Sequence, residues 1–273
     1  MLSVKARSSR LQAATLTSIG EEGRPEQVES KLTQSIFAGA FADGERLPSE
    51  SELSRLLGVS LVTVREALFA LRVKGLIETR RGRGGGSFVR AGLKESEYHT
   101  VRVLMGMPRV QLADLGLHYE MISASCAELA CERAAEFELD VIAEILAQAR
   151  NSPRPIWRRQ ITDVQMELAS LSQSVRLTYE HVKVQTLFTP LLALQDADEK
   201  ARFETHANLE AQLQAIRVGS SAEARKVVRE GIRESTRWLI SFRAELVADP
   251  SEENIRLLLS SRNTRSESGR GGQ

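Results

Sequence analysis

The sequence has no long apolar run. Its longest apolar stretches are far shorter than the roughly 20 residues that a helix needs to span a bilayer, and no early segment joins a basic start to an apolar run. We therefore expect neither a membrane-spanning helix nor a secretory leader. The expected location is the cytoplasm, without a membrane partner.

Cysteine is scarce as well, since the chain has only Cys126 and Cys131. The two lie five positions apart in a segment with helical spacing, so they should point to different sides of that helix. A disulfide between them is not expected, and we interpret both as packed free thiols. The later part of the chain also lacks a glycine-rich phosphate loop, internal repeats and coiled-coil heptads.

The length and composition are those of one large or two ordinary folded domains. With 273 residues, of which 42% are hydrophobic and 27% charged, the chain can bury real cores, so disorder of the whole chain is excluded. The net charge of +1 hides an asymmetry, because residues 1–93 hold 14 basic and 10 acidic residues whereas residues 94–273 hold 23 and 26. A positive face attracts polyanions, and nucleic acid is the one we expect.

A helix is predicted from residue 61 to residue 74. Its apolar residues follow the i, i+3, i+4, i+7 spacing of one buried stripe. They are Val64, Ala67, Leu68 and Leu71. Ser60 stands at the N-cap position, and Gly75 stands where helices commonly end in the left-handed conformation. The stripe leaves Thr63, Arg65, Glu66 and Arg72 elsewhere on the helix surface.

Two shorter helices are predicted before this one. Pro25 suits a first helical residue, and a helical stripe continues to about Ala38. Ser49 with Glu52 three positions later matches a capping box, and the helix that it opens should close at Gly58. The short turn after Gly58 leads into the helix at 61–74, which is the arrangement of a helix-turn-helix.

A hairpin is predicted after these helices. Residues 76–79 and 87–90 are strand-like, and the sequence RRGRGGG separates them. Residues 65–90 include seven basic and only two acidic residues. Glycine lets a backbone approach a duplex closely, and arginine suits the negative potential of a narrow minor groove. We interpret the hairpin as a wing beside the helix-turn-helix; the alternative is a flexible solvated loop.

Together these motifs resemble the N-terminal domain of the GntR family of bacterial transcription regulators. The resemblance rests on LPSESELSRLLGVS, then VREAL, then GLIETRRGRGGGSFV, in that order. It implies a winged helix-turn-helix that binds double-stranded operator DNA. Two positions depart from the family pattern, because Ser51 and Leu61 stand where relatives often carry arginine. Since a bidentate arginine–guanine pair contributes roughly 1–3 kcal/mol of discrimination, we expect an altered base preference.

The candidate DNA contacts come from two sources. Carried over position by position, the resemblance assigns contacts to Ser60, Thr63, Arg65, Arg81 and Gly82. The positive charge of the same segment adds Arg72, Arg80 and Arg83 to this set.

Beyond residue 92 the spacing of apolar residues is almost wholly helical. A short helix near 95–105 and six longer segments show it, at 112–134, 138–149, 155–170, 176–194, 200–218 and 222–246. Pro190 should kink or bound its helix. The expected fold is therefore mainly α: a winged helix-turn-helix with a small β-hairpin wing, followed by an all-α bundle of six or seven helices.

Four parts of the chain are predicted. Residues 1–23 should be a disordered extension, 24–92 the DNA-binding domain, 93–250 the all-helical domain, and 251–273 a short helix with a disordered tail.

The helical part shows a looser resemblance of its own. Asp114-Leu115, the helix ending at 129–134, and the segment 206–219 followed by Ala224 resemble the FCD domain of the FadR subfamily. That resemblance implies a domain that dimerises and senses a small-molecule effector. Many FCD domains also bind a divalent metal through an Asp, a His four residues later and two further His. This ligand set suits Zn²⁺ or Ni²⁺.

Half of this ligand set is altered here. The four positions fall on Asp163, Glu167, His206 and Gly231, and Tyr119 stands where metal-binding relatives often carry an arginine. We therefore expect a remodelled pocket, with Tyr119, Asp163, Glu167 and His206 as its candidate residues.

Three interpretations of Asp163, Glu167 and His206 stay open. They form a reduced metal site completed by water, or they belong to a metal-free pocket for a different, more apolar ligand. In the third, they satisfy one another or face solvent in a domain that only dimerises. His118 and His181 have no supporting cluster and are given structural roles.

The leading functional hypothesis is a homodimeric repressor that binds a pseudo-palindromic operator and changes its DNA affinity when an effector binds. One alternative is a ligand-independent developmental or architectural regulator with a vestigial pocket. A remote alternative is a helical metallo-hydrolase that uses Asp163, Glu167 and His206. We do not expect an enzyme, because no nucleophile–base pair has a recognisable setting.

Overall fold

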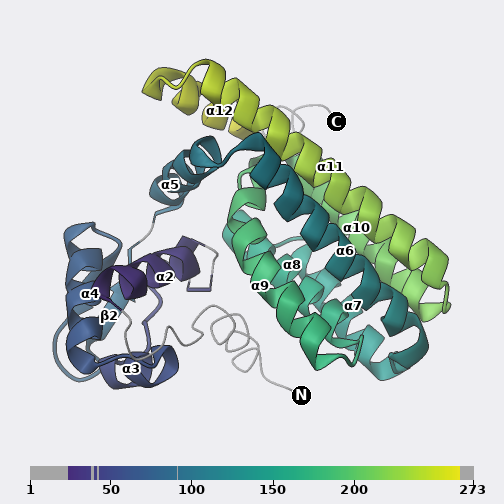
Figure 1. Ribbon diagram of the computed structural model, residues 1–273, viewed down its shortest axis with the longest axis horizontal. Helices are drawn as coiled ribbons and strands as arrows, with labels where there is room; N and C mark the ends of the chain where they lie inside the picture. The colour runs from purple at the N-terminus through teal and green to yellow at the C-terminus, as the bar shows by residue number, and fades with distance from the viewer. Residues whose placement is uncertain (1–23, 38–39, 42, 91, 265–273) are drawn as a thin grey trace. The chain divides into compact units, whose positions relative to one another are not determined.

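The computed structural model of this chain describes residues 24–37, 40–41, 43–90 and 92–264 (Figure 1). The chain divides into two units, of which the first ends at Tyr98 and the second begins at His99. This division falls inside helix α5 (Leu93–Gly106), a few residues after the predicted boundary at residue 92. The predicted disorder of residues 1–23 and of the last residues, 265–273, lies outside the described residues.

The first unit contains three helices and a hairpin. The helices are α2 (Pro25–Phe37), α3 (Glu50–Leu57) and α4 (Leu61–Val73), and the hairpin strands are β1 (Ile77–Arg80) and β2 (Gly86–Val89). All five elements were predicted, and their ends fall within about two residues of the predicted ones. Both α2 and α3 pack against α4. The stripe predicted on α4 is the centre of this packing, because Val64, Ala67, Leu68 and Leu71 are all buried.

The hairpin strands pair antiparallel, with Ile77 opposite Val89 and Arg80 opposite Gly86. An isolated bridge adds Arg46 opposite Phe88, so the chain before α3 runs beside β2. The amide of Leu47 donates to the carbonyl of Ser87 at 2.9 Å in the same stretch. The bridge and this hydrogen bond join the wing to the segment that leads into α3.

The second unit is a helical bundle. After α5 its helices are α6 (Arg109–Arg133), α7 (Glu136–Ala149), α8 (Arg154–Ser170), α9 (Val175–Leu192), α10 (Glu199–Arg217) and α11 (Ser221–Ala248), and α12 (Glu252–Thr264) follows. The long helices α6 and α11 pack along each other (Figure 1), α9 packs on α6, α10 on α11, and α7 on α8. The bundle fold predicted for this part of the chain is confirmed.

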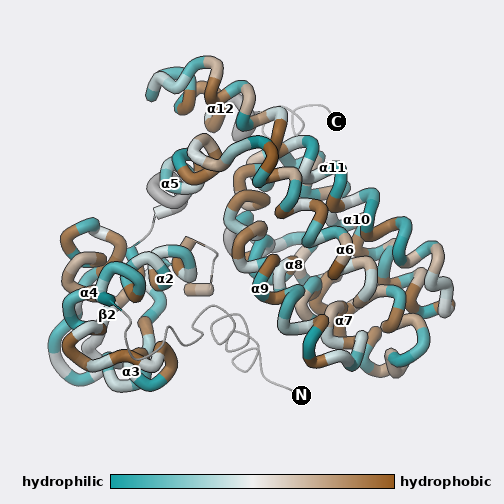
Figure 2. Tube along the Cα trace, viewed as in Figure 1, coloured by the Kyte–Doolittle hydropathy of each residue, from teal (hydrophilic) through white to brown (hydrophobic). Residues whose placement is uncertain are grey.

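One core of this bundle lies between α7, α8, α10 and the C-terminal half of α6. Apolar and polar segments alternate along α11 (Figure 2), as expected for a helix with one buried face. The largest members of this core are Leu139, Ile142, Ile145, Leu146, Trp157, Ile161, Leu168, Leu171, Leu209, Leu213 and Ile216. Their burial supplies the main apolar stabilisation of this region.

Pro190 lies inside α9, which ends two residues later at Leu192. The helix gives way to a 3₁₀ turn at Gln195–Ala197, where the sequence predicted a break. Cys126 and Cys131 are both free cysteines, the first buried and the second partly exposed. Among the helices that the structure describes, none combines the length and the apolar composition needed to cross a membrane.

Candidate nucleic-acid interface and internal cavity

Local hydrogen bonds fix where α3 begins and how the turn between α3 and α4 closes. The Ser49 amide donates to Glu52 Oε2 at 2.8 Å and the Glu52 amide to Ser49 Oγ at 3.3 Å, which is the predicted capping box. Gly58 ends α3 with φ +68, a left-handed conformation that favours glycine. The Ser54 hydroxyl donates to the Val59 carbonyl at 2.6 Å and closes the turn. Sequence patterns alone predicted both ends of this helix.

The first turn of α4 is capped by the residues predicted to contact DNA. The Thr63 amide donates to Ser60 Oγ at 3.1 Å, and the hydroxyls of Ser60 and Thr63 lie 2.9 Å apart. Both hydroxyls are exposed. The pair therefore both caps the helix and presents polar atoms at its N-terminal end.

The two arginines of α4 are exposed, and each donates a hydrogen bond to a neighbouring side chain. Arg65 donates from Nε to Glu50 Oε2 at 2.7 Å, which links α4 to the start of α3. Arg72 donates to Thr79 Oγ1 at 3.0 Å, which links α4 to the wing. Because both pairs are solvent-exposed, they are weak and either arginine can exchange its partner for a phosphate.

Apolar side chains on the outer face of α4 were missed by the sequence interpretation. Leu61, Val62, Phe69 and Val73 are all exposed. Helical spacing distinguishes the buried stripe from the polar residues, but it does not show that the remaining face is largely hydrocarbon.

The wing presents arginines on a tight glycine loop. Gly82 and Gly84 have φ of +96 and +91, and the Gly85 amide donates to the Gly82 carbonyl at 2.8 Å. A Cβ on Gly85 would lie 2.5 Å from the Arg80 carbonyl, so a larger residue does not fit there. Arg81 and Arg83 are exposed at this loop, and within the described part of the chain neither has an ion-pair partner.

The remaining wing arginines are held against the hairpin. Arg80 bonds to Glu78 and its guanidinium lies 4.3 Å from the centre of the Phe88 ring. Arg46 lies beside Gly86, where an added Cβ would come within 2.7 Å of its Nε. Arg46 is exposed and was missed as a candidate contact, because no local pattern indicates that the chain before α3 runs beside the wing.

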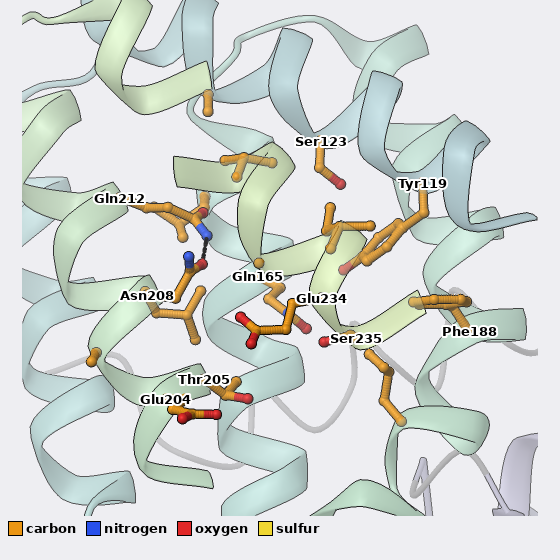
Figure 3. Close-up of a pocket in the computed structure, with 18 of the residues that line it drawn as sticks. Tyr119, Ser123, Gln165, Phe188, Glu204, Thr205, Asn208, Gln212, Glu234 and Ser235 are labelled. Carbon is orange, nitrogen blue, oxygen red and sulfur yellow. Dashed lines mark hydrogen bonds between the residues drawn. The ribbon is translucent and has the colours of Figure 1, made fainter. Parts of the chain in front are cut away.

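The second unit contains a cavity of about 330 Å³. Its wall is formed by α6, α8, α9, α10 and α11 (Figure 3). Three rings meet at one side: Tyr119 lies 5.3 Å from Phe188 and 5.4 Å from His181, measured between ring centres. Burial raises the pKa of the Tyr119 phenol, so its hydroxyl stays protonated.

Amide side chains line another side of the cavity. Gln212 donates to Asn208 Oδ1 at 2.6 Å, and Asn208 donates to the Val227 carbonyl at 2.9 Å (Figure 3). Gln165 accepts from Gln185 at 2.9 Å. These bonds orient neutral donors and acceptors in the wall.

The charged side chains of the cavity wall differ in burial and in their ion-pair partners. Arg158 lines it but donates from Nε to Asp196 Oδ2 at 2.7 Å and from Nη2 to the other carboxylate oxygen, in a buried ion pair. Glu204 and Glu234 line it too, and both are exposed (Figure 3). Glu204 pairs with Lys200 at 3.5 Å in an exposed and therefore weak contact, whereas the pair of Arg158 is buried.

His181 was given a structural role, but it lies in the cavity wall. It is almost completely buried, and its Nδ1 has no hydrogen-bond partner. Burial lowers the pKa of His181 to about 4, so the imidazole is neutral near pH 7. A search for clusters in the sequence could not find it, because its neighbours come from other helices.

The predicted pocket residues are only partly brought together. Tyr119 lines the cavity, but Asp163, Glu167 and His206 do not. On α8 the cavity is instead lined by Gln165, Leu168 and Ala169. A displacement of two positions turns a helical side chain by about 200°, which places the predicted carboxylates on a different face.

Three interpretations of Asp163, Glu167 and His206 were left open, and the first was a reduced metal site. Among the described residues, no group of three or more His, Cys, Asp or Glu side chains is placed to hold a metal ion. His206 Nε2 instead lies 3.5 Å from Glu210. At Gly231 an added Cβ would lie 2.7 Å from Asn208 Oδ1, so the Asn208 amide occupies the space of a side chain there.

Comparison with known proteins agrees with the first unit. Residues 24–86 match the profile of the bacterial regulatory proteins of the gntR family. RmpR of Mycobacterium gastri, a putative HTH-type transcriptional regulator by its name, is 30% identical over 242 residues, which are 86% of this chain and 87% of that protein. The HTH-type transcriptional repressor NanR of Citrobacter rodentium is 35% identical over 128 residues, which are 44% of this chain and 47% of that protein.

Two solved structures align with most of the chain at low identity. McbR/YncC of E. coli aligns with 80% of this chain and 97% of that one, at 20% identity and a TM-score of 0.48. A GntR protein of Streptococcus agalactiae aligns with 78% and 99%, at 18% identity and a TM-score of 0.39. The relationship to RmpR covers nearly the whole of both chains. This chain therefore belongs to the GntR family of bacterial transcription regulators and carries its DNA-binding helix-turn-helix domain.

Proposed function

We propose that this regulator is a homodimeric repressor whose helical unit is an FCD-type domain, and that a small molecule bound in its cavity changes operator affinity. The observation that carries the proposal is the cavity of about 330 Å³, whose wall includes the unpartnered Nδ1 of buried His181. Buried polar atoms in proteins almost always have a partner, and a ligand with a polar group would supply it.

The charges of the wall favour an uncharged or cationic ligand over a carboxylate. Arg158 is committed to Asp196, and His181 is neutral, so neither offers a free positive charge. Glu204 and Glu234 would repel an anion and attract an amine. The rings of Tyr119 and Phe188 provide a flat apolar surface beside the amides. The ligand class that fits is a hydroxylated or amino-bearing small molecule with one apolar face.

Homodimerisation is supported by an apolar face on α6. Val110, Leu117 and Met121 are exposed at positions i, i+7 and i+11, which lie along one side of a helix. Asp114 is exposed between Val110 and Leu117 on this side, and Leu117 and Met121 are neighbours one turn apart. An exposed apolar pair of this kind supports a protein interface. A second copy of the chain is the proposed partner, because a twofold protein would present two helix-turn-helix units to a twofold operator.

Repression is supported by the naming of the NanR relatives as repressors, and by the similarity that this chain shares with them over part of its length. The proposed site of action is the chromosome in the cytoplasm. A bound ligand would change operator affinity only by the difference between its affinities for the DNA-competent and DNA-incompetent states.

The test uses matched probes that differ in charge but share a skeleton. Glucose, glucosamine and glucuronate form one series, and benzyl alcohol, benzylamine and benzoate another, within a larger fragment library sorted by charge. Thermal stability is measured with each probe, and operator affinity with each stabilising one. We expect neutral or cationic members to raise Tm and weaken operator binding.

Two variants locate the effect. Ser235→Phe should fill the cavity and abolish the stabilisation, whereas Ser241→Phe, an exposed change on the same helix, should not. If only carboxylates stabilise the protein, the proposed uncharged or cationic ligand class is wrong, but control of operator affinity by a ligand remains supported. Ligands that stabilise without changing operator affinity would favour the ligand-independent regulator instead.

A further inference from the structure

The N-terminal end of α4 exposes hydrocarbon rather than positive charge. Its first two residues, Leu61 and Val62, have 43% and 60% of their surface exposed. In a helix-turn-helix, the N-terminal residues of the second helix contact base edges in the major groove. Two apolar side chains therefore stand at the end of the helix that reads bases.

The polar groups around them are engaged in other contacts. The hydroxyls of Ser60 and Thr63 lie 2.9 Å apart, and Ser60 also accepts from the Thr63 amide. Arg65, one turn after Leu61 on the same face, is bonded to Glu50. At the first turn of α4, Leu61 and Val62 therefore offer methyl groups to a base beside the hydroxyls of Ser60 and Thr63.

Only one base carries a methyl group in the major groove. Thymine carries a C5 methyl group there, whereas guanine presents the acceptors N7 and O6, and cytosine presents an amino donor. A guanine or cytosine edge pressed against Leu61 would lose water without gaining a hydrogen-bond partner, which costs free energy. A thymine methyl would instead be buried favourably against the same side chain.

We infer that Leu61 and Val62 read thymine methyl groups, so that A·T pairs occupy the operator positions opposite the first turn of α4. The inference rests on the DNA-binding domain and does not depend on the cavity or on dimerisation. Phe69 and Val73 are also exposed, but Val73 lies about 18 Å further along the helix axis than Leu61, from twelve rises of 1.5 Å. Val73 therefore serves as a control for apolar surface that does not read bases.

The test removes the methyl group and nothing else. Binding sites are first selected from random duplex DNA with the full-length wild-type protein, and each selected thymine is then replaced by uracil. The dissociation constant of each duplex is measured by fluorescence anisotropy at one salt concentration. We expect one or two thymines in the stretch contacted by each helix-turn-helix at which uracil weakens binding about fourfold, the value of one buried methyl group.

Three variants test which side chain contacts each thymine methyl group. Leu61→Ala and Val62→Ala should each lose sensitivity to uracil at one of these positions, whereas Val73→Ala should keep the wild-type sensitivity at all of them. Leu61→Arg should select guanine where the wild type selects thymine. All of these side chains are exposed, so the variants should fold, which circular dichroism will verify.

Two results would overturn the inference. One is a wild-type site at which uracil is tolerated everywhere. The other is a set of sensitive thymines that stay equally sensitive in both Leu61→Ala and Val62→Ala. Wild-type affinity for the selected duplex is measured before any uracil is introduced, so a failure of sequence-specific binding would be seen by itself. That failure would overturn the inference together with the DNA-binding assignment.

Discussion

Arg158 and Asp196 form a buried ion pair between α8 and the 3₁₀ turn after α9, with Arg158 Nε 2.7 Å from Asp196 Oδ2. Arg202 adds a bond of 2.8 Å to the Asp196 carbonyl from α10. The ion pair and the Arg202 bond together link three segments of the bundle at the cavity wall. The ion pair also removes the guanidinium of Arg158 from the groups that a ligand can use.

Replacement of Asp196 should be strongly destabilising. Asp196→Ala would leave the buried Arg158 guanidinium uncompensated, and loss of one partner of such a pair costs about 3–5 kcal/mol. Urea unfolding at pH 7 measures the change. Glu210→Gln breaks the exposed pair with Arg150 and should cost less than about 1 kcal/mol. Equal effects of the two substitutions would show that the Asp196 pair is not buried in solution.

The stability of the second unit should fall in mild acid because of His181. Burial lowers the pKa of His181 to about 4, below its unfolded value of 6.5, so the unfolded chain binds a proton first. The contribution of this residue is complete above pH 6.5 and is lost as the pH falls toward 4. The difference between the folded and unfolded pKa values corresponds to a loss of about 3 kcal/mol in the free energy of unfolding.

The pH effect is measured by urea unfolding from pH 7 to pH 4.5. His181→Gln removes the titrating group and should flatten the profile, whereas His118→Gln, at an exposed position, should leave it steep. A profile that stays equally steep in His181→Gln would assign the acid sensitivity to other groups.

Gly116 should tolerate no side chain, because α6 and α11 approach closely there. A Cβ at Gly116 would lie 2.4 Å from Thr236 Oγ1 and 2.5 Å from its Cγ2. Gly116→Ala should therefore destabilise the fold by about 1–3 kcal/mol through overpacking. Gly106→Ala is the control, since an added Cβ there meets nothing within 4 Å. The double variant Gly116→Ala/Thr236→Ala should recover part of the stability; no recovery would place the strain elsewhere.

The wing arginines should contribute to the salt dependence of operator binding. Replacing Arg81 and Arg83 with alanine should lower the slope of log K against log salt by about 0.9 for each phosphate that the wing no longer neutralises. The same measurement on Arg225→Ala, which lies on α11 and pairs with Glu128, should give the wild-type slope. An unchanged slope in the wing variant would mean that neither arginine lies near phosphate.

The apolar face of α6 should be needed for dimerisation. Leu117→Asp with Met121→Asp places two charges on this face and should give a monomer by native mass spectrometry, with weaker operator binding. Val175→Asp, a change at another highly exposed apolar residue, should leave the mass of the dimer unchanged. A dimer that persists in the double variant would move the interface away from α6.

The two units differed in how far sequence could predict them. In the first, Ser49, Glu52 and Ser60 lie within three residues of their partners, so the caps that set α3 and α4 could be found by spacing alone. Arg46 could not be found this way, because its place beside Gly86 depends on the pairing of distant segments. The exposed hydrocarbon of Leu61 and Val62 was visible in the sequence but became informative only when their exposure was known.

By itself the sequence determined the winged helix-turn-helix, the all-helical second part and the family, because these rest on local periodicity, capping and motif order. The tertiary structure decided which helix faces line the cavity. Gln165 and Ala169 face it where Asp163 and Glu167 were predicted, and Asn208 lines it where His206 was predicted. Every position on a bundle helix lies about 100° from the next, so the inward face depends on how neighbouring helices pack, which is a property of contacts between residues far apart in the sequence.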